Sequence, residues 1–160
     1  MNAAQLRTGA MAGMLALVLA ACGSETGDGG MGVTLEDGST VTTAISDKGL
    51  AVPANLPDFA PIYPGGIVEN VVVNEGAPGK GILSFKVKAT VAEVASFYRQ
   101  NGEKVGLDLK QDQDTGSGQS LMFIKPGAPV GDDYGVQLNI GQDMRAADHV
   151  VVAMTYAGPA

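Results

Sequence analysis

Apolar and polar residues alternate along several stretches in the second half of the chain. The alternation is clearest at 81–88 and recurs at 134–141 and 150–156. A period of two is typical of a strand with one face in the core and the other in water. With an additional β-branched run and two shorter segments, the pattern predicts six strands: 67–73, 81–88, 105–110, 120–125, 134–141 and 150–156.

One segment has a helical pattern instead. Thr90 and Glu93 have the spacing of a capping box, in which side chain and backbone groups satisfy each other at the first turn of a helix. The apolar positions that follow are spaced i, i+3, i+4 and i+7: Val91, Val94, Ala95 and Tyr98. Asn101-Gly102 is typical of a helix end, so the segment predicts a helix of roughly three turns.

The order of these elements is strand-strand-helix-strand-strand-strand-strand. Strands that follow one another beside a single helix predict an α+β fold, here an antiparallel sheet of about six strands with one helix packed on one face. We expect this domain to occupy residues 67–158.

Residues 33–66, which precede the domain, have a different pattern. Asp37-Gly38 lies between runs rich in Thr, Val and Leu, which predicts a hairpin. The segment from 46 to 66 contains four prolines, which exclude a long helix or a central strand. We expect that proline-rich segment to form an extended strap against the domain.

The amino terminus has the pattern of a targeting segment. The segment from Thr8 to Ala21 has 14 uncharged residues, fewer than the roughly 20 that a permanent membrane-spanning helix needs. A basic start, a short apolar run and small residues at its end predict a signal peptide over residues 1–21. Residues 22–32 are rich in glycine and predict a flexible tether.

Leu19-Ala20-Ala21-Cys22 resembles the lipobox of bacterial lipoproteins. In that family signal peptidase II cuts before the cysteine, which is diacylated and often acylated on its new amino group. The resemblance therefore implies cleavage between Ala21 and Cys22, a diacylglycerol and an N-acyl lipid at Cys22, and no other cofactor. Two buried chains anchor a protein stably where one is marginal. The alternative is a plain signal peptide with an incidental cysteine nearby.

The resemblance also bears on localisation. In enteric bacteria an Asp after the cysteine favours retention in the inner membrane, whereas this chain has Gly23. The resemblance therefore favours the outer membrane over the inner membrane, with the domain facing the periplasm. Cleavage would remove Arg7 and change the net charge from −7 to −8. Because anionic lipid surfaces repel an acidic domain, the acyl chains would have to hold it at the membrane.

A second resemblance covers the domain. Leu56-Pro57, Tyr63-Pro64-Gly65-Gly66 and the helix positions Thr90, Val94, Phe97 and Tyr98 are similar to a layout in small Gram-negative envelope lipoproteins. Those proteins have a Tyr-Pro-Gly strap, a strand pair and a Thr…Val…Phe-Tyr helix before further strands. The resemblance implies a fold and leaves function to be argued from a site.

Composition excludes several classes of protein. One Cys and one His cannot form a disulfide within the chain or a Cys/His metal cluster. A net charge of −7 argues against nucleic acid as a partner, because such binding needs a basic face. With 45% hydrophobic and 17% charged residues the chain is globular.

Candidate catalytic and metal-binding residues are few. Asp148 precedes His149, but a relay requires a nucleophile close in space, and no nucleophile-elbow motif is present. Asp112 and Asp114 resemble the start of a calcium loop, yet Gly116 stands at the third ligand position and no Glu closes the loop. A polar hairpin tip explains the same residues.

Four aromatic residues, Phe59, Tyr63, Phe97 and Tyr98, belong to the predicted strap and helix. They form either part of the core or a groove for a peptide or a small apolar ligand. The leading hypothesis is a non-catalytic interaction or accessory module, anchored to the membrane through Cys22, with an envelope protein as its partner. The alternatives are a small-ligand-binding protein that uses a groove between helix and sheet, and a hydrolase that uses Asp148 and His149.

Overall fold

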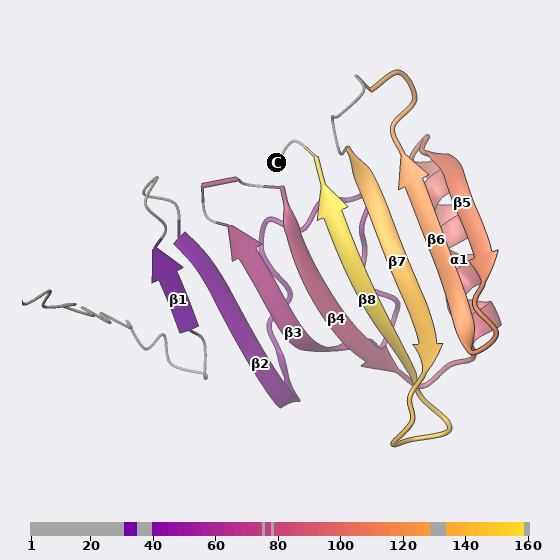
Figure 1. The fold of residues 1–160 in the computed structure, drawn as a ribbon, viewed down its shortest axis with the longest axis horizontal. Helices are drawn as coiled ribbons and strands as arrows, with labels where there is room; N and C mark the ends of the chain where they lie inside the picture. The colour runs from indigo at the N-terminus through magenta and orange to yellow at the C-terminus, as the bar shows by residue number, and fades with distance from the viewer. Residues whose placement is uncertain (1–30, 35–39, 75, 78, 129–133, 159–160) are drawn as a thin grey trace, which may run out of the picture.

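The computed structural model describes residues 31–34, 40–74, 76–77, 79–128 and 134–158, which form one antiparallel sheet and one helix (Figure 1). The strands are β1 (Met31–Thr34), β2 (Thr40–Leu50), β3 (Ile67–Asn74), β4 (Gly81–Val87), β5 (Asp108–Asp114), β6 (Gly118–Ile124), β7 (Gly135–Gln142) and β8 (Val150–Ala157), and the helix is α1 (Val91–Lys104). Across the sheet the strand order is β1-β2-β3-β4-β8-β7-β6-β5. The last strand in sequence therefore lies at the centre, beside β4.

The α+β class is confirmed, but the prediction of about six strands is wrong, because the described residues form eight. The two further strands are β1 and β2, which pair with each other as the predicted hairpin would. Their connection, 35–39, lies outside the described residues. β2 joins the sheet because it pairs with β3, whose backbone groups on that side would otherwise lack partners.

Two boundaries also differ from the prediction. β1 begins at Met31, inside the segment predicted as a tether over 22–32. β2 continues to Leu50, into the segment predicted as part of the strap. Its pairing with β3 shifts register between Ile45 and Leu50. This bulge lets β2 continue beyond the residues whose pattern predicts a strand.

One face of the sheet is covered by α1 and by the strap, residues 51–66, both of which lie behind the sheet in Figure 1. On β4 the covered side carries Leu83, Phe85 and Val87, all buried. The same alternation buries one side of β7 and β8, as the sequence pattern predicts. The core therefore lies between these strands and the layer formed by α1 and the strap.

The strap is tied to the helix by hydrogen bonds between residues far apart in sequence. The Tyr98 hydroxyl donates to the carbonyl oxygen of Pro61 at 2.8 Å, and the Asn101 side-chain amide donates to that of Phe59 at 3.3 Å. Phe59 and Ala60 are buried. The prediction of an apolar strap against the domain is therefore confirmed for these residues.

Helix α1 begins as predicted. The Glu93 backbone amide donates to the Thr90 hydroxyl oxygen at 3.2 Å, and the Thr90 amide donates to the Glu93 carboxylate at 2.8 Å. The Thr90 amide and the Thr90 hydroxyl both donate to the Glu93 carboxylate, which favours its charged form and lowers the pKa of Glu93. No helix within the described residues is long and apolar enough to cross a membrane.

The end of α1 differs from the prediction. The helix continues through Gly102 to Lys104, and the residue with a left-handed backbone is Gly106, at φ 73°. The Leu107 amide donates to the carbonyl oxygen of Gly102 at 2.9 Å, which closes the helix across Gly106. Because this cap uses residues up to 107, the strand predicted from 105 begins at Asp108.

Candidate functional site

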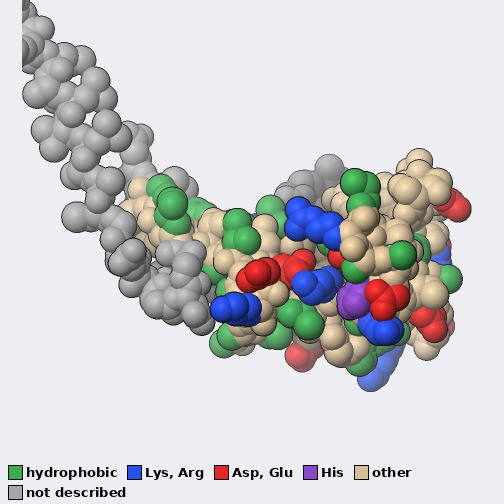
Figure 2. All heavy atoms as spheres, turned by 90° about the horizontal axis from the view of Figure 1, so that it is seen from below, with side chains coloured by type: hydrophobic (Ala, Val, Ile, Leu, Met, Phe, Trp, Pro, Cys, Tyr) green, Lys and Arg blue, Asp and Glu red, His purple; other side chains and the backbone are tan. Residues whose placement is uncertain are grey.

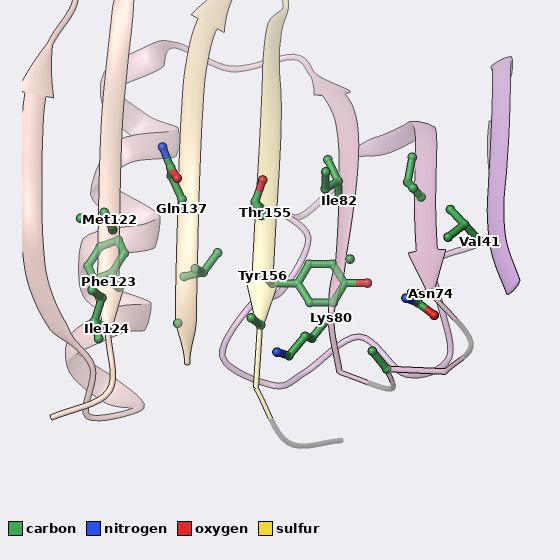
Figure 3. Close-up of a pocket in the computed structure, with 16 residues that line it drawn as sticks. Val41, Asn74, Lys80, Ile82, Met122, Phe123, Ile124, Gln137, Thr155 and Tyr156 are labelled. Carbon is green, nitrogen blue, oxygen red and sulfur yellow. The ribbon is translucent and has the colours of Figure 1, made fainter. Parts of the chain in front are cut away.

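A groove of about 580 Å³ lies on the face of the sheet opposite α1 and the strap (Figure 3). We call this side the open face, because no described helix or strap covers it, and the cavity the open-face groove. Its lining comes from six neighbouring strands, β2, β3, β4, β8, β7 and β6. Apart from the buried Val136, the aliphatic side chains that line it are Val41, Val72, Ala77, Ile82, Met122, Ile124 and Ala157.

The groove is apolar because several strands have apolar residues on both faces. On β3, Val71 points to the core and Val72 to the open face. On β4, Leu83 is fully buried while Ile82, next to it on the other face, is 49% exposed. A strand whose other face meets only water would carry polar residues at such positions. The consecutive β-branched residues at 71–73 and 150–152 are the sequence signal that could have indicated a second apolar face.

The exposed surface of the groove is aliphatic rather than aromatic. All eight aromatic side chains of the protein either belong to the core or pack against it. Phe123 and Tyr156 also line the groove, but their side chains are buried on the covered side of the sheet. Burial raises the pKa of the Tyr156 hydroxyl.

Polar groups in the lining are few and lie between the aliphatic residues. Gln137 and Thr155 face each other on β7 and β8, and Asn74 lies at the end of β3. Lys80 is the one charged residue among the described lining and stands just before β4, at the rim of the groove and near the middle of its span across the strands (Figure 3). Although the chain has 17 acidic residues, none in its described part lines the groove.

The structure packs three of the four predicted aromatic residues against one another, whereas the Phe59 ring packs against Tyr134 with centroids 5.2 Å apart. Tyr63 and Phe97 are in edge contact with ring centroids 5.0 Å apart, and Phe97 and Tyr98 at 5.1 Å. Tyr98 and Phe59 are buried, and burial raises the pKa of the Tyr98 hydroxyl well above its usual range. A pocket of about 360 Å³ beside the strap is lined by residues 54–59 and Tyr134 and includes only Phe59 of the four.

Asp112 and Asp114 are not placed as a cation site. The Asp112 carboxylate accepts two hydrogen bonds from the Arg99 guanidinium, at 2.7 and 2.9 Å, and this ion pair lowers the pKa of Asp112. Asp114 accepts a hydrogen bond from the amide of Gly116 at 2.7 Å, within the turn after β5. In the described part of the chain no three His, Cys, Asp or Glu side chains are grouped as metal ligands.

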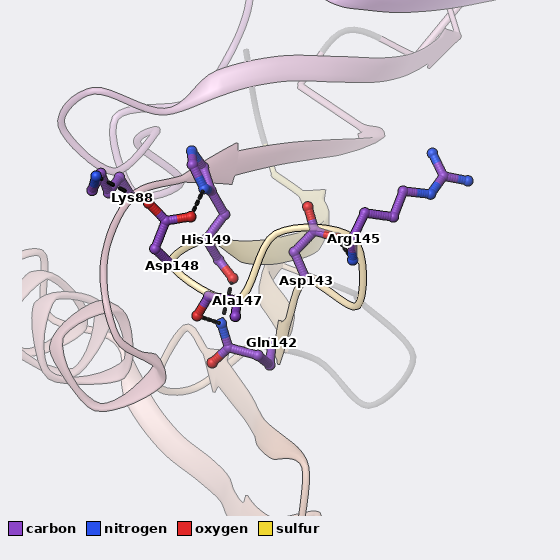
Figure 4. Close-up of polar contacts among 7 residues, drawn as sticks. All are labelled: Lys88, Gln142, Asp143, Arg145, Ala147, Asp148 and His149. Carbon is purple, nitrogen blue, oxygen red and sulfur yellow. Dashed lines mark hydrogen bonds and ion pairs between the residues drawn. The ribbon is translucent and has the colours of Figure 1, made fainter.

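Asp148 and His149 belong to a polar cluster in the connection between β7 and β8 (Figure 4). The Asp148 carboxylate contacts His149 Nδ1 at 2.8 Å and Lys88 Nζ at 3.0 Å. The Gln142 side-chain amide donates to the carbonyl oxygens of Ala147 and His149, both at 2.7 Å. Figure 2 shows the single histidine between acidic and basic side chains at this end of the molecule. None of the residues in the cluster is a Ser, Thr or Cys that could act as a nucleophile. The contacts of the cluster hold the connection between β7 and β8 together.

We expect the Asp148 carboxyl to titrate at about pH 2, because Lys88 and His149 lower its pKa from 3.8 to about 2. A pKa that is lower in the folded state than in the unfolded state stabilises the fold above the unfolded value. This contribution is therefore lost as the pH falls from about 4 to about 2. Carboxyl-carbon NMR titration measures the midpoint directly, and Lys88→Gln should raise it while Lys104→Gln leaves it unchanged. An equal midpoint in wild type and Lys88→Gln would contradict the assignment.

The chain matches no protein-family model, no curated protein and no solved structure.

Proposed function

We propose that this protein is an envelope lipoprotein, anchored to a membrane through acyl chains on Cys22 and carrying a non-catalytic binding domain. The support for the anchor is the lipobox resemblance at residues 19–22 and the glycine-rich segment after it. The same resemblance favours the outer membrane, with the domain facing the periplasm. In this arrangement the sheet is a binding surface held close to a lipid bilayer, with an envelope protein or a small ligand bound to it.

The observation that carries the binding function is the open face of the sheet. Nine large hydrophobic residues are exposed in the described part of the chain. Five of them have the register of the open face: Met31, Val33, Ile45, Ile67 and Ile82. Solvent-exposed apolar residues gathered on one surface mark an interaction site in a soluble domain.

A small ligand is the second candidate, and the open-face groove favours it. The strap and helix aromatics, by contrast, occupy the space between these elements with their own side chains. A hydrolase that uses Asp148 and His149 has less support. Both residues are in a cluster that holds a chain connection, and neither lines the groove.

Labelled palmitate should be incorporated into the full chain in a bacterial host, and Cys22→Ala should abolish the labelling. The reason is that Cys22 is the only cysteine and hence the only residue that can carry the thioether-linked diacylglycerol. Gly23→Ala is the matched control and should retain the label. The measurement is autoradiography of the immunoprecipitated protein. Unlabelled wild-type protein, expressed at the level of the control, would overturn the anchoring proposal.

A further inference from the structure

We infer that the open-face groove binds a single-chain amphiphile with an anionic head group. Its hydrocarbon chain would lie on the aliphatic residues across the sheet, and its head group would meet the Lys80 ammonium. The inference rests on the binding half of the proposed function and is independent of the anchor at Cys22. A free fatty acid and a lysophospholipid share this chemistry.

The shape of the groove suits an extended chain. Its volume of about 580 Å³ is within the range of small-molecule sites in proteins. It crosses from Val41 on β2 to Met122 on β6, which is five strand spacings, or about 24 Å at roughly 4.8 Å each. Figure 3 shows the lining residues spread across these strands rather than around one deep hollow. A long, shallow apolar site of this kind is matched by a hydrocarbon chain.

The side chains of the groove favour a hydrocarbon over a protein or a sugar. Protein interfaces take most of their binding energy from Trp, Tyr and Arg, and sugars and bases stack on aromatic rings. The apolar side chains on the open face of the groove are instead Val, Ile, Met and Ala, with every aromatic ring of the protein on the covered side. Met122 is unbranched and adapts to an irregular partner. A flexible aliphatic chain gains the most from such a surface, because burial of apolar area is non-directional.

The charge of the groove selects the head group. Lys80 is the single charged residue in the described lining, and no described carboxylate is paired with its ammonium group. The Lys80 amide donates to the Ala77 carbonyl oxygen at 3.2 Å, which fixes its backbone at the rim of the groove. A cation at the rim of an apolar site complements a carboxylate or a phosphate monoanion. Gln137 and Thr155 add hydrogen-bonding groups along the floor.

The test is a displacement assay on the full chain with Cys22→Ala, in which no covalently attached acyl chain competes for the groove. The probe is 11-(dansylamino)undecanoic acid, whose fluorescence rises in an apolar site. Palmitate and lysophosphatidylglycerol should displace it, and the stronger of the two identifies the source of the ligand. Uncharged monopalmitoylglycerol should bind at least ten-fold more weakly. Because the variant is not acylated, the result does not depend on the palmitate labelling experiment.

Two variants locate the site. Ile82→Gln should weaken the binding of every ligand at least ten-fold, whereas Ile67→Gln, on the same face but outside the lining, should not. Lys80→Gln should weaken anionic ligands about ten-fold and leave monopalmitoylglycerol unchanged, with Lys48→Gln as its control. Lys80 is exposed, so its variant keeps the core intact even if Ile82→Gln lowers stability.

Several results would overturn the inference. The first is the absence of saturable probe binding to the folded protein. The second is equal affinity for the charged and the uncharged palmitoyl ligands. The third is a stable dimer in sedimentation that excludes the probe, since a second copy would then cover the open face.

Discussion

The Phe85→Ala variant should be less stable than the wild type by about 3–5 kcal/mol. Phe85 is fully buried on β4, one of the two central strands, and lies opposite Val68 and Val152 in the neighbouring strands. The strap crosses it closely, because a Cβ atom placed on Gly66 would come within 2.8 Å of the Phe85 ring. Removing the ring would therefore leave a cavity between sheet and strap that neither can close. Urea denaturation at pH 7 measures the loss as a change in the free energy of unfolding.

Ile82→Ala is the matched control for Phe85→Ala. Ile82 lies on the same strand but on the open face, and it is 49% exposed. Its truncation removes partly hydrated methyl groups and should cost about 1 kcal/mol or less. Losses of equal size in the two variants would show that the open face is as buried in solution as the core. That result would contradict the assignment of the two faces.

The contrast between Phe85 and Ile82 also shows what sequence patterns can and cannot predict. Alternation predicts which residues of a strand share a face, and this prediction is confirmed on β4, β7 and β8. Whether the second face is covered depends on segments far away in the chain. Here α1 and the strap both lie on one side, so the aliphatic residues of the other side remain accessible.

The number of strands depended on long-range pairing in the same way. Asp37-Gly38 is a local signal, and the two strands it predicts do pair. Their attachment to β3, and the bulge that extends β2 to Leu50, arise from contacts with residues about 25 positions further along the chain, which no local pattern encodes. The groove is likewise built from six strands, so the sequence could not predict it as a site.

The candidate site residues show the same limit. The spacing of residues in α1 predicts that Tyr98 lies on its buried side, and the prolines predict a strap beside the domain. Only the structure shows that the Tyr98 hydroxyl donates to the carbonyl oxygen of Pro61, 37 residues away. It also shows that the rings of Phe97 and Tyr98 pack against each other. Local patterns predicted which residues are apolar, and the packing decided whether they form core or groove.

The Gly102→Ala variant should be destabilised by about 1–2 kcal/mol, although alanine is the better helix former. Gly102 is inside α1 and buried, and a Cβ atom there would lie 2.5 Å from two carbons of the Phe123 ring. Phe123 is itself buried in β6, with 2% of its surface exposed. Overpacking costs up to about 3 kcal/mol and outweighs the roughly 1 kcal/mol of helix propensity that alanine gains. Thermal or urea unfolding measures the net effect.

A double variant separates the two contributions. With Phe123→Leu the ring is gone, so adding Gly102→Ala to that background should be neutral or stabilising by up to about 1 kcal/mol. Gly106→Ala is the control, because its cost comes from a positive φ of 73° with open space around the Cβ position. Phe123→Leu should therefore leave that cost unchanged. If Gly102→Ala were stabilising in the wild-type background, α1 would not pack against Phe123 of β6 through Gly102.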